Sequence, residues 1–228
     1  MKKRSKRYKE ILKSKNNDKK ISLKEILELL KKNSNVKFDE SIDVSLRINL
    51  KQSKGGDLSL RTTINLPNGS GKKSKIAVLC EPDKIEIAKK SGADVYGSDD
   101  LIENIAAGKF NFTKLICTPA MMGKIGKHGK VLGPKGLMPN PKLGTVTTDI
   151  AKAVKDLKTG LVEIRNDKDG NLSSTIGRKS FPVDKLIENY SHFIDSVKKE
   201  KPNTIKGDFV KNIFLSSTMG ISYKVGVK

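Results

Sequence analysis

The chain has 228 residues, and its 46 Lys and Arg residues outnumber 25 Asp and Glu residues, which gives a formal net charge of +21. This excess indicates a polyanionic partner, most simply nucleic acid, with a generally basic surface or an anionic membrane as weaker alternatives. No stretch approaches 18 consecutive apolar residues and no apolar segment follows the basic N-terminus, so we expect no membrane span, no secretory signal and a cytoplasmic protein.

Residues 1–20 form a basic arm with ten Lys or Arg residues. Part of this arm is predicted to dock as a helix, because three apolar residues can share one helical face: Tyr8, Ile11 and Leu12. Ser22 followed by Glu25 is a capping box, which predicts the start of a short helix with a leucine-rich and isoleucine-rich face.

Two segments then alternate between apolar and polar residues, at residues 42–50 and 58–66. This period of two predicts half-buried strands with one face on a core. A linker at residues 51–57 joins them, and the Pro/Asn/Gly/Ser run at residues 67–71 ends the pattern.

From residue 75 the pattern changes to short apolar strands that alternate with helices. The expected strands are residues 76–80, 93–96 and 115–118, and the expected helices are residues 83–91, 98–106 and 150–157. Ser98 is the predicted N-cap of the second helix. This order predicts a parallel, doubly wound sheet.

Residues 121–146 contain six Gly, three Pro and five Lys residues, and no acidic residue lies between Glu103 and Asp149. Gly loosens the backbone and Pro restricts it, so we expect no regular helix or strand here. The segment is predicted to be either an ordered irregular structure or a mobile loop, with a functional role or a packing role left open.

The last part returns to half-buried strands, at residues 161–165 and 172–176. A long amphipathic helix follows, with Pro182 expected at its first position, and two final strands at residues 209–216 and 221–227 meet at Ser217–Gly220. We therefore predict α/β and α+β architecture in two domains. Residues 1–67 and 160–228 would form one discontinuous α+β domain, with a Rossmann-like α/β domain inserted at residues 68–159.

The sequence offers little for catalysis. Cys80 and Cys117 each end an apolar run, which predicts reduced, buried thiols, and with His128 and His192 they give no zinc spacing. The phosphate-binding loop and the dinucleotide fingerprint both fail among the glycine-rich segments. We expect no metal, no cofactor and no enzymatic activity.

Aromatic residues make up only 5% of the chain and tryptophan is absent. Few aromatic side chains are therefore available to stack on the bases of a single-stranded nucleic acid. We therefore favour folded RNA, read through its shape, phosphates and 2′-hydroxyls. Each candidate contact also has a structural explanation. Phe38 could be a core residue, Gly220 a hairpin residue, Asp167 a turn residue and Glu25 only a helix cap.

Several short motifs, taken in order, resemble the bacterial ribosomal protein L1 family, the stalk proteins of the large subunit. The most specific is Leu132-Gly133-Pro134-Lys135-Gly136-Leu137-Met138-Pro139-Asn140-Pro141-Lys142, followed by Gly144-Thr145-Val146. The others are Lys6-Arg7-Tyr8, Lys37-Phe38-Asp39-Glu40, Gly92-Ala93-Asp94, Arg165-Asn166-Asp167-Lys168 and Ser217-Thr218-Met219-Gly220. Bacterial members commonly have Pro after this last run, where this chain has Ile221.

The resemblance implies a structural protein that binds 23S-type ribosomal RNA in the mobile stalk near the tRNA exit site. It also implies help in releasing deacylated exit-site tRNA, repression of the messenger RNA of its own operon, and a monomer off the ribosome. Carried over by motif, the implied RNA-binding residues are Phe38, Thr218, Met219 and Gly220, then Lys37, Glu25, Asp167, Lys168, Ser217, Lys6 and Arg7.

Overall fold

The computed structural model describes residues 5–13, 21–49, 60–72, 74–202, 205 and 207–226. The chain separates into two compact units. One, here called the terminal unit, combines Met1–Gly71 with Val162–Lys228, and the other, the middle unit, is Lys72–Leu161. An antiparallel sheet lies in the first and a parallel sheet in the second, which confirms the mixed α/β prediction.

The main sheet of the terminal unit is antiparallel and has the strand order β7-β1-β8-β9. Its strands are β1 (Ser41–Ile48), β7 (Asn171–Arg178), β8 (Val210–Ser217) and β9 (Ser222–Val225). A second, two-stranded sheet pairs β2 (Arg61–Asn65) with β6 (Leu161–Arg165). The predicted linker at residues 51–57 and the start of the second alternating segment lie outside the described residues.

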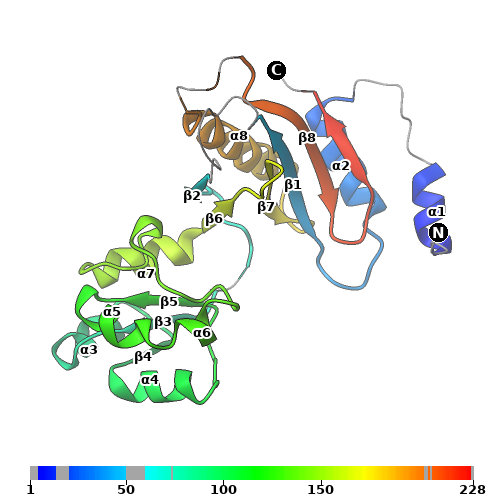
Figure 1. The fold of residues 1–228 in the computed structure, drawn as a ribbon. Helices are drawn as coiled ribbons and strands as arrows, with labels where there is room; N and C mark the ends of the chain where they lie inside the picture. The colour runs from blue at the N-terminus through cyan, green and yellow to red at the C-terminus, as the bar shows by residue number, and fades with distance from the viewer. Residues whose placement is uncertain are drawn as a thin grey trace. The chain divides into compact units, whose positions relative to one another are not determined.

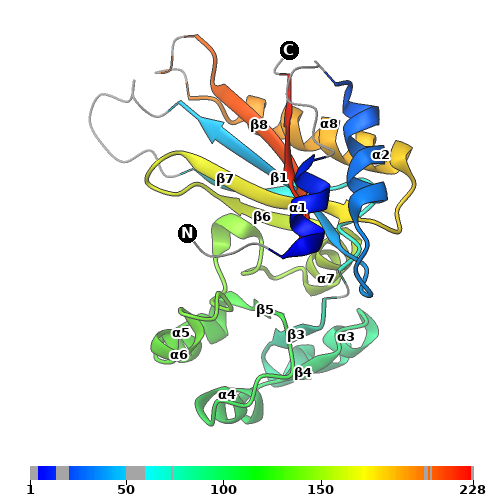
Figure 2. The ribbon, with the colours of Figure 1, turned by 90° about the vertical axis from the view of Figure 1, so that its right-hand side faces the viewer.

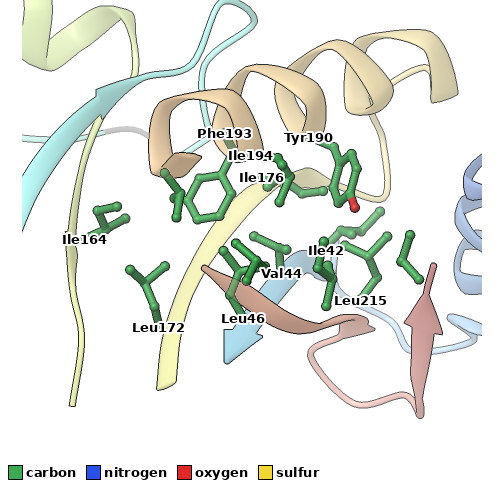
Figure 3. Close-up of a cluster of buried hydrophobic side chains, with 14 of the residues drawn as sticks. Ile42, Val44, Leu46, Ile164, Leu172, Ile176, Tyr190, Phe193, Ile194 and Leu215 are labelled. Carbon is green, nitrogen blue, oxygen red and sulfur yellow. The ribbon is translucent and has the colours of Figure 1, made fainter. Parts of the chain in front are cut away.

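Helices α2 (Leu23–Asn33) and α8 (Val183–Lys199) pack against each other and against the main sheet, as Figures 1 and 2 show. The alternation in β1 explains this arrangement, because Ile42, Val44 and Leu46 all lie on the buried face. Phe193 and Ile194 of α8 point toward these side chains in Figure 3. The opposite face of the sheet carries mostly polar side chains.

Helix α1 (Lys6–Lys13) forms within the basic arm, as its apolar spacing predicted. Ile11 is buried and Tyr8 packs against the core of the terminal unit, whereas Leu12 is exposed. Helix α2 begins at the predicted capping box: Ser22 Oγ accepts from the Glu25 N–H, and a Glu25 oxygen accepts from the Ser22 N–H.

The sheet of the middle unit is parallel, with the order β4-β3-β5, and helices cover both of its faces. Helices α4, α5 and α6 pack on one face and α3 and α7 on the other. The strands are β3 (Ile76–Leu79), β4 (Val95–Gly97) and β5 (Lys114–Cys117). The helices are η1 (Pro82–Lys84), α3 (Ile85–Lys90), α4 (Asp99–Ala106), α5 (Pro119–Gly126), α6 (Gly129–Leu132), η2 (Pro141–Leu143) and α7 (Ile150–Thr159).

The prediction that residues 121–146 contain no regular helix was wrong, because α5, α6 and η2 form there. Met121, Ile125 and Leu132 are buried on one face of the parallel sheet, and this burial outweighs the helix-breaking tendency of the glycines. Left-handed backbone is confined to Gly136 and Gly144 within this segment.

Two helix starts also differ from expectation. Ser98 precedes α4, but its side chain makes no capping hydrogen bond. Pro182 is the N-cap of α8 with extended backbone, so the helix begins one residue later, at Val183. No helix among the described residues has both the length and the apolar character needed to cross a membrane.

Candidate nucleic-acid interface

Four residues at the junction of β8 and β9, Ser217–Gly220, form a tight connection that we call the Met219 turn. The Gly220 N–H donates to the Ser217 carbonyl at 3.1 Å, and the Thr218 N–H donates to the Ser41 carbonyl at 3.2 Å. The register pairs Ile42 with Ser217, so the start of β1 lies beside this turn. The Met219 turn therefore meets the segment that leads into β1, which carries Lys37 and Phe38.

The hydroxyl of Thr218 belongs to a polar chain along β1. It accepts from the Ser41 N–H at 3.1 Å and lies 2.9 Å from the Ser41 hydroxyl. The Ser41 hydroxyl in turn donates to a carboxylate oxygen of Asp43 at 3.3 Å, and Thr175 donates to the other oxygen at 2.6 Å. These hydrogen bonds hold the Thr218 side chain in place, although Thr218 is exposed.

Glu40 is fully buried, and its Oε2 accepts from the Met219 N–H at 3.1 Å. Burial alone would raise the pKa of this carboxyl, but the Ser217 hydroxyl, the Met219 N–H, the Ser34 hydroxyl and the charge of Arg7 together hold the pKa below its usual value of 4.5. The Ser34 and Ser217 hydroxyl oxygens and Glu40 Oε1 are themselves buried. A charged carboxylate therefore underlies the turn.

Arg7 approaches the same turn from helix α1. Its Nη2 donates to the Met219 carbonyl at 2.6 Å, across 212 residues of sequence. Lys6 is exposed on the same helix, and Arg4 of the predicted arm lies outside the described residues. The N-terminal helix thus places the cationic side chain of Arg7 beside the turn.

Apolar and cationic side chains project to solvent here. Phe38 is 52% exposed and Met219 is 50% exposed. The possibility that Phe38 is a core residue is therefore wrong, and neighbouring Lys37 is exposed as well. This end of the sheet combines apolar, cationic and hydrogen-bonding groups.

Gly220 is needed for packing inside the turn. A Cβ built on it would lie 2.3 Å from the Ser217 Oγ, closer than any real contact of this kind. The expectation that Gly220 is a hairpin residue is consistent with this.

Asp167 and Lys168 lie in the turn between β6 and β7, beyond the other end of β1, where Arg47 pairs with Asn171. The length of β1 separates this position from the Met219 turn by about 20 Å. Asp167 Oδ1 accepts from the N–H groups of Asp169 and Asn171, and the hydrogen bonds from Asn171 lower the pKa of its carboxyl. Asp167 is therefore a turn-former whose neighbour Lys168 is exposed.

Glu25 is exposed at the first turn of α2, where one oxygen already accepts from the Ser22 N–H. Its role as a helix cap is confirmed. None of the hydrogen bonds described for Glu25 joins it to the Met219 turn, so its predicted contact with RNA stays a prediction.

Sequence reasoning missed Glu40, Ser41 and Asp43 as parts of the site. Glu40 could have been found, because the even-numbered positions of β1 are its buried face and position 40 extends that series by one step. A carboxylate at such a buried position needs hydrogen-bonding partners, which indicates that Glu40 is part of the site.

The described residues of the middle unit include two cysteines but no group of metal-ligating side chains. Cys80 and Cys117 are free and buried, as predicted, and burial raises the pKa of the Cys117 thiol to about 12. No group of three or more metal-ligating side chains occurs among the residues that the structure describes.

Comparison with known proteins identifies relatives along nearly the whole chain. Residues 30–221 match the model of the ribosomal protein L1p/L10e family. The large ribosomal subunit protein uL1 of Pelagibacter ubique is 56% identical over 204 residues, 89% of each chain. The proteins of the same name from Kosmotoga olearia and Cutibacterium acnes are 47% and 45% identical, over 99% and 96% of this chain and 97% and 94% of their own lengths.

These matches identify the chain as an RNA-binding ribosomal protein. It belongs to the ribosomal protein L1p/L10e family. The family resemblance stated from the motifs is thereby confirmed, and so is the expectation that the protein is not an enzyme.

Proposed function

We propose that this chain is a structural protein of the large ribosomal subunit that binds large-subunit ribosomal RNA with the Met219 turn and the segment Lys37–Asp43. The single observation that carries this proposal is the convergence of the motifs Lys37–Glu40 and Ser217–Gly220, which the hydrogen bond from the Met219 N–H to Glu40 joins across 179 residues. Exposed Phe38 and Met219 flank that junction. The relatives are named as proteins of the large ribosomal subunit, which supports large-subunit ribosomal RNA as the partner.

In this proposal cationic and apolar side chains make different kinds of contact with the RNA. Lys6, Arg7 and Lys37 neutralise phosphates, while Phe38 and Met219 pack against sugar or base faces. Ser217 and Gly220 shape the turn so that RNA can approach its backbone closely.

Asp167, Lys168 and Glu25 would contact RNA away from the Met219 turn. The separation of about 20 Å along β1 corresponds to several nucleotides, so one folded RNA element can reach both ends of the strand. The face of the sheet between them carries Ser45 and Ser173, with the partly exposed ring of Phe214 on the strand position that pairs with Ser45.

The family resemblance supports finer roles, which we propose in addition. The RNA partner would be the mobile stalk near the exit site, where the protein assists release of deacylated tRNA. A messenger RNA of its own operon with a similar fold would be repressed by the same surface. The protein would be a monomer when it is not on the ribosome.

We further propose that the two compact units are separate domains: a discontinuous α+β domain that binds RNA, and an inserted Rossmann-like α/β domain. The terminal unit has its own continuous apolar core, and the middle unit has cores on both faces of its sheet. Each unit therefore has the burial that an independent domain requires.

The test is binding and chemical footprinting of the full chain on large-subunit ribosomal RNA from the same organism. The control ligands are duplex DNA and an unrelated structured RNA, both of equal length and measured at the same salt concentration. We expect protection of one RNA region and an affinity at least about 100-fold above both controls. Equal affinity for all three nucleic acids would instead indicate a general polyanion binder.

A further inference from the structure

The chain leaves the terminal unit through residues 66–71, here called the crossing segment, and a buried asparagine of α8 holds its first part. Asn189 is fully buried. Its Oδ1 accepts from the Asn68 N–H at 3.0 Å, and its Nδ2 donates to the Gly69 carbonyl at 3.0 Å and to the Ile176 carbonyl of β7 at 2.7 Å. Both amide hydrogens of Asn189 are therefore used, and releasing the crossing segment here would leave buried polar groups without partners.

Arg178, the last residue of β7, holds the other end of the crossing segment. Its Nε donates to the Gly71 carbonyl at 3.0 Å, and its Nη1 donates to the Asp39 carbonyl at 3.2 Å. Gly71 is the last residue of the terminal unit before the chain enters the middle unit. Asp39 lies in the motif Lys37–Glu40, which the proposed function assigns to RNA binding. One guanidinium group thus joins the candidate RNA-binding motif to the crossing segment.

The turn after β7 also holds Asp39 by its side chain. Ser180 donates its N–H to Asp39 Oδ1 at 3.1 Å and its hydroxyl to Asp39 Oδ2 at 2.8 Å. The Lys179 N–H donates to the Glu40 carbonyl at 2.8 Å. The backbone and the side chain of Asp39 are therefore both fixed, and exposed Phe38 is the residue directly before it.

Gly71 and Arg178 are matched in shape. Gly71 has a φ of 72°, and a Cβ built on it would lie 3.1 Å from Arg178 Cγ and 3.1 Å from Phe181 Cζ. A larger residue at this position would be strained and would push against the Arg178 side chain. Arginine carries donors in a rigid fork that reaches two carbonyls, whereas lysine ends in one compact ammonium group, so we expect lysine to keep only one of the two contacts.

We infer that Arg178 is a positioning residue for RNA binding and that it couples the motif Lys37–Glu40 to the crossing segment. RNA bound to this motif favours the arrangement in which Asp39 meets Arg178, and the same arrangement holds Gly71. RNA on the terminal unit thereby restricts local opening of the chain that leads to the middle unit. Coupling of this kind is reciprocal, so a weaker hold on Gly71 lowers RNA affinity. The inference rests on the proposed function and concerns what RNA binding does to the protein.

The first measurement is hydrogen exchange of the full chain, read by mass spectrometry on a peptide that covers residues 66–72. The probe is an RNA copy of the protected region of large-subunit ribosomal RNA, and the control is an unrelated structured RNA. We expect the probe to slow exchange in this peptide by about fivefold or more, because local opening of the crossing segment is suppressed. This comparison uses the wild-type chain alone. Unchanged exchange at saturating probe would overturn the inference and leave RNA binding standing.

Two variants that conserve charge separate coupling from direct cover by RNA. Arg178→Lys loses the two-way link, and Arg61→Lys changes an arginine that pairs with Glu163 in the two-stranded sheet. We expect Arg178→Lys to remove the slowing by RNA and to weaken RNA binding by about fivefold or more, while Arg61→Lys keeps both as in wild type. Slowing that persists in Arg178→Lys would show that RNA itself covers the crossing segment, which would overturn the inference.

Gly71→Ala tests the reciprocal effect from the other end of the link. It should weaken RNA binding by about fivefold or more in the wild-type background and have little further effect in Arg178→Lys, because the link is already broken there. Thermal unfolding shows that each variant is folded at the temperature of the assay. Equal losses in the two backgrounds would overturn the inference.

The salt dependence of binding distinguishes a positioning residue from a phosphate contact. Arg178→Gln should lower RNA affinity and leave the slope of log affinity against log salt unchanged, since Arg178 neutralises no phosphate. A slope smaller by about one would mark a phosphate contact and overturn the inference alone. A wild-type chain that does not prefer the ribosomal probe over unrelated RNA would overturn the proposed function, and the inference with it.

Discussion

Glu40 shows at the scale of a single residue how the core of the terminal unit controls its surface. The side chain continues the buried face of β1, yet it ends in a charge that accepts from the Met219 N–H. Nearby hydroxyls and Arg7 keep that charge stable in spite of burial. The conformation of an exposed turn therefore depends on a buried carboxylate.

The lowered pKa of Glu40 makes a prediction about acid stability. A carboxyl with a folded-state pKa below 4.5 adds stability above that pH, and the contribution disappears as the pH falls through the folded-state value. Glu40→Gln lacks this titration, so the free energy of unfolding should differ most between wild type and variant near neutral pH, by about 1–3 kcal/mol. The difference should shrink steadily below pH 4.5. Urea unfolding across this range measures it, and a difference independent of pH would contradict the account.

The effects of substitutions at Gly220 and Ser217 on the free energy of unfolding should be coupled. Gly220→Ala places a Cβ on the Ser217 Oγ, so the hydroxyl must rotate away from Glu40, and we expect a loss of about 1–2 kcal/mol in the free energy of unfolding. In a Ser217→Ala background the obstructing oxygen is absent, and the remaining Ser217 Cβ is at an ordinary 3.5 Å. The same Gly220→Ala change should then be nearly neutral. Equal losses in both backgrounds would show that the clash does not matter.

At the scale of the element, the segment at residues 121–146 offers a matched pair of glycines, one inside helix α5 and one at the end of η2. Gly123 lies inside α5 with nothing within 4 Å of an added Cβ, whereas Gly144 has a positive φ of 68°. Gly123→Ala should stabilise the chain by roughly 0.5–1 kcal/mol, and Gly144→Ala should destabilise it by about 1 kcal/mol or more. Thermal unfolding checks both signs, and destabilisation by Gly123→Ala would mean that α5 is not helical at that position.

Elements differ in how far their sequence predicts them. The start of α2 could be predicted because Ser22 and Glu25 satisfy each other locally. Helix α5 could not, since it depends on burial of Met121 and Ile125 in a core that includes Ala77 and Leu79 of β3, a strand distant in sequence. The same reason explains why the motifs at residues 37–40 and 217–220 were both noticed, while Glu40 was not recognised as their link.

At the scale of the whole molecule, the net charge of +21 should make RNA affinity strongly salt-dependent. We expect a slope of log affinity against log salt of roughly −4 to −8, for about six to ten phosphate contacts. Lys37→Gln should reduce the magnitude of that slope by about one, because it removes one phosphate contact. Filter binding at a series of salt concentrations measures both, and an affinity unaffected by salt would exclude phosphate neutralisation as the source of binding.

The central claim is that the Met219 turn, at this end of the main sheet, binds ribosomal RNA. Its most direct test compares Met219→Ala with Ile87→Ala, since both side chains are 50% exposed but Ile87 lies in the middle unit. With unfolding temperatures unchanged, the account predicts that Met219→Ala weakens binding to large-subunit ribosomal RNA by about tenfold, the loss of one buried apolar anchor, and that Ile87→Ala leaves it as in wild type. Equal affinities for the two variants would contradict it.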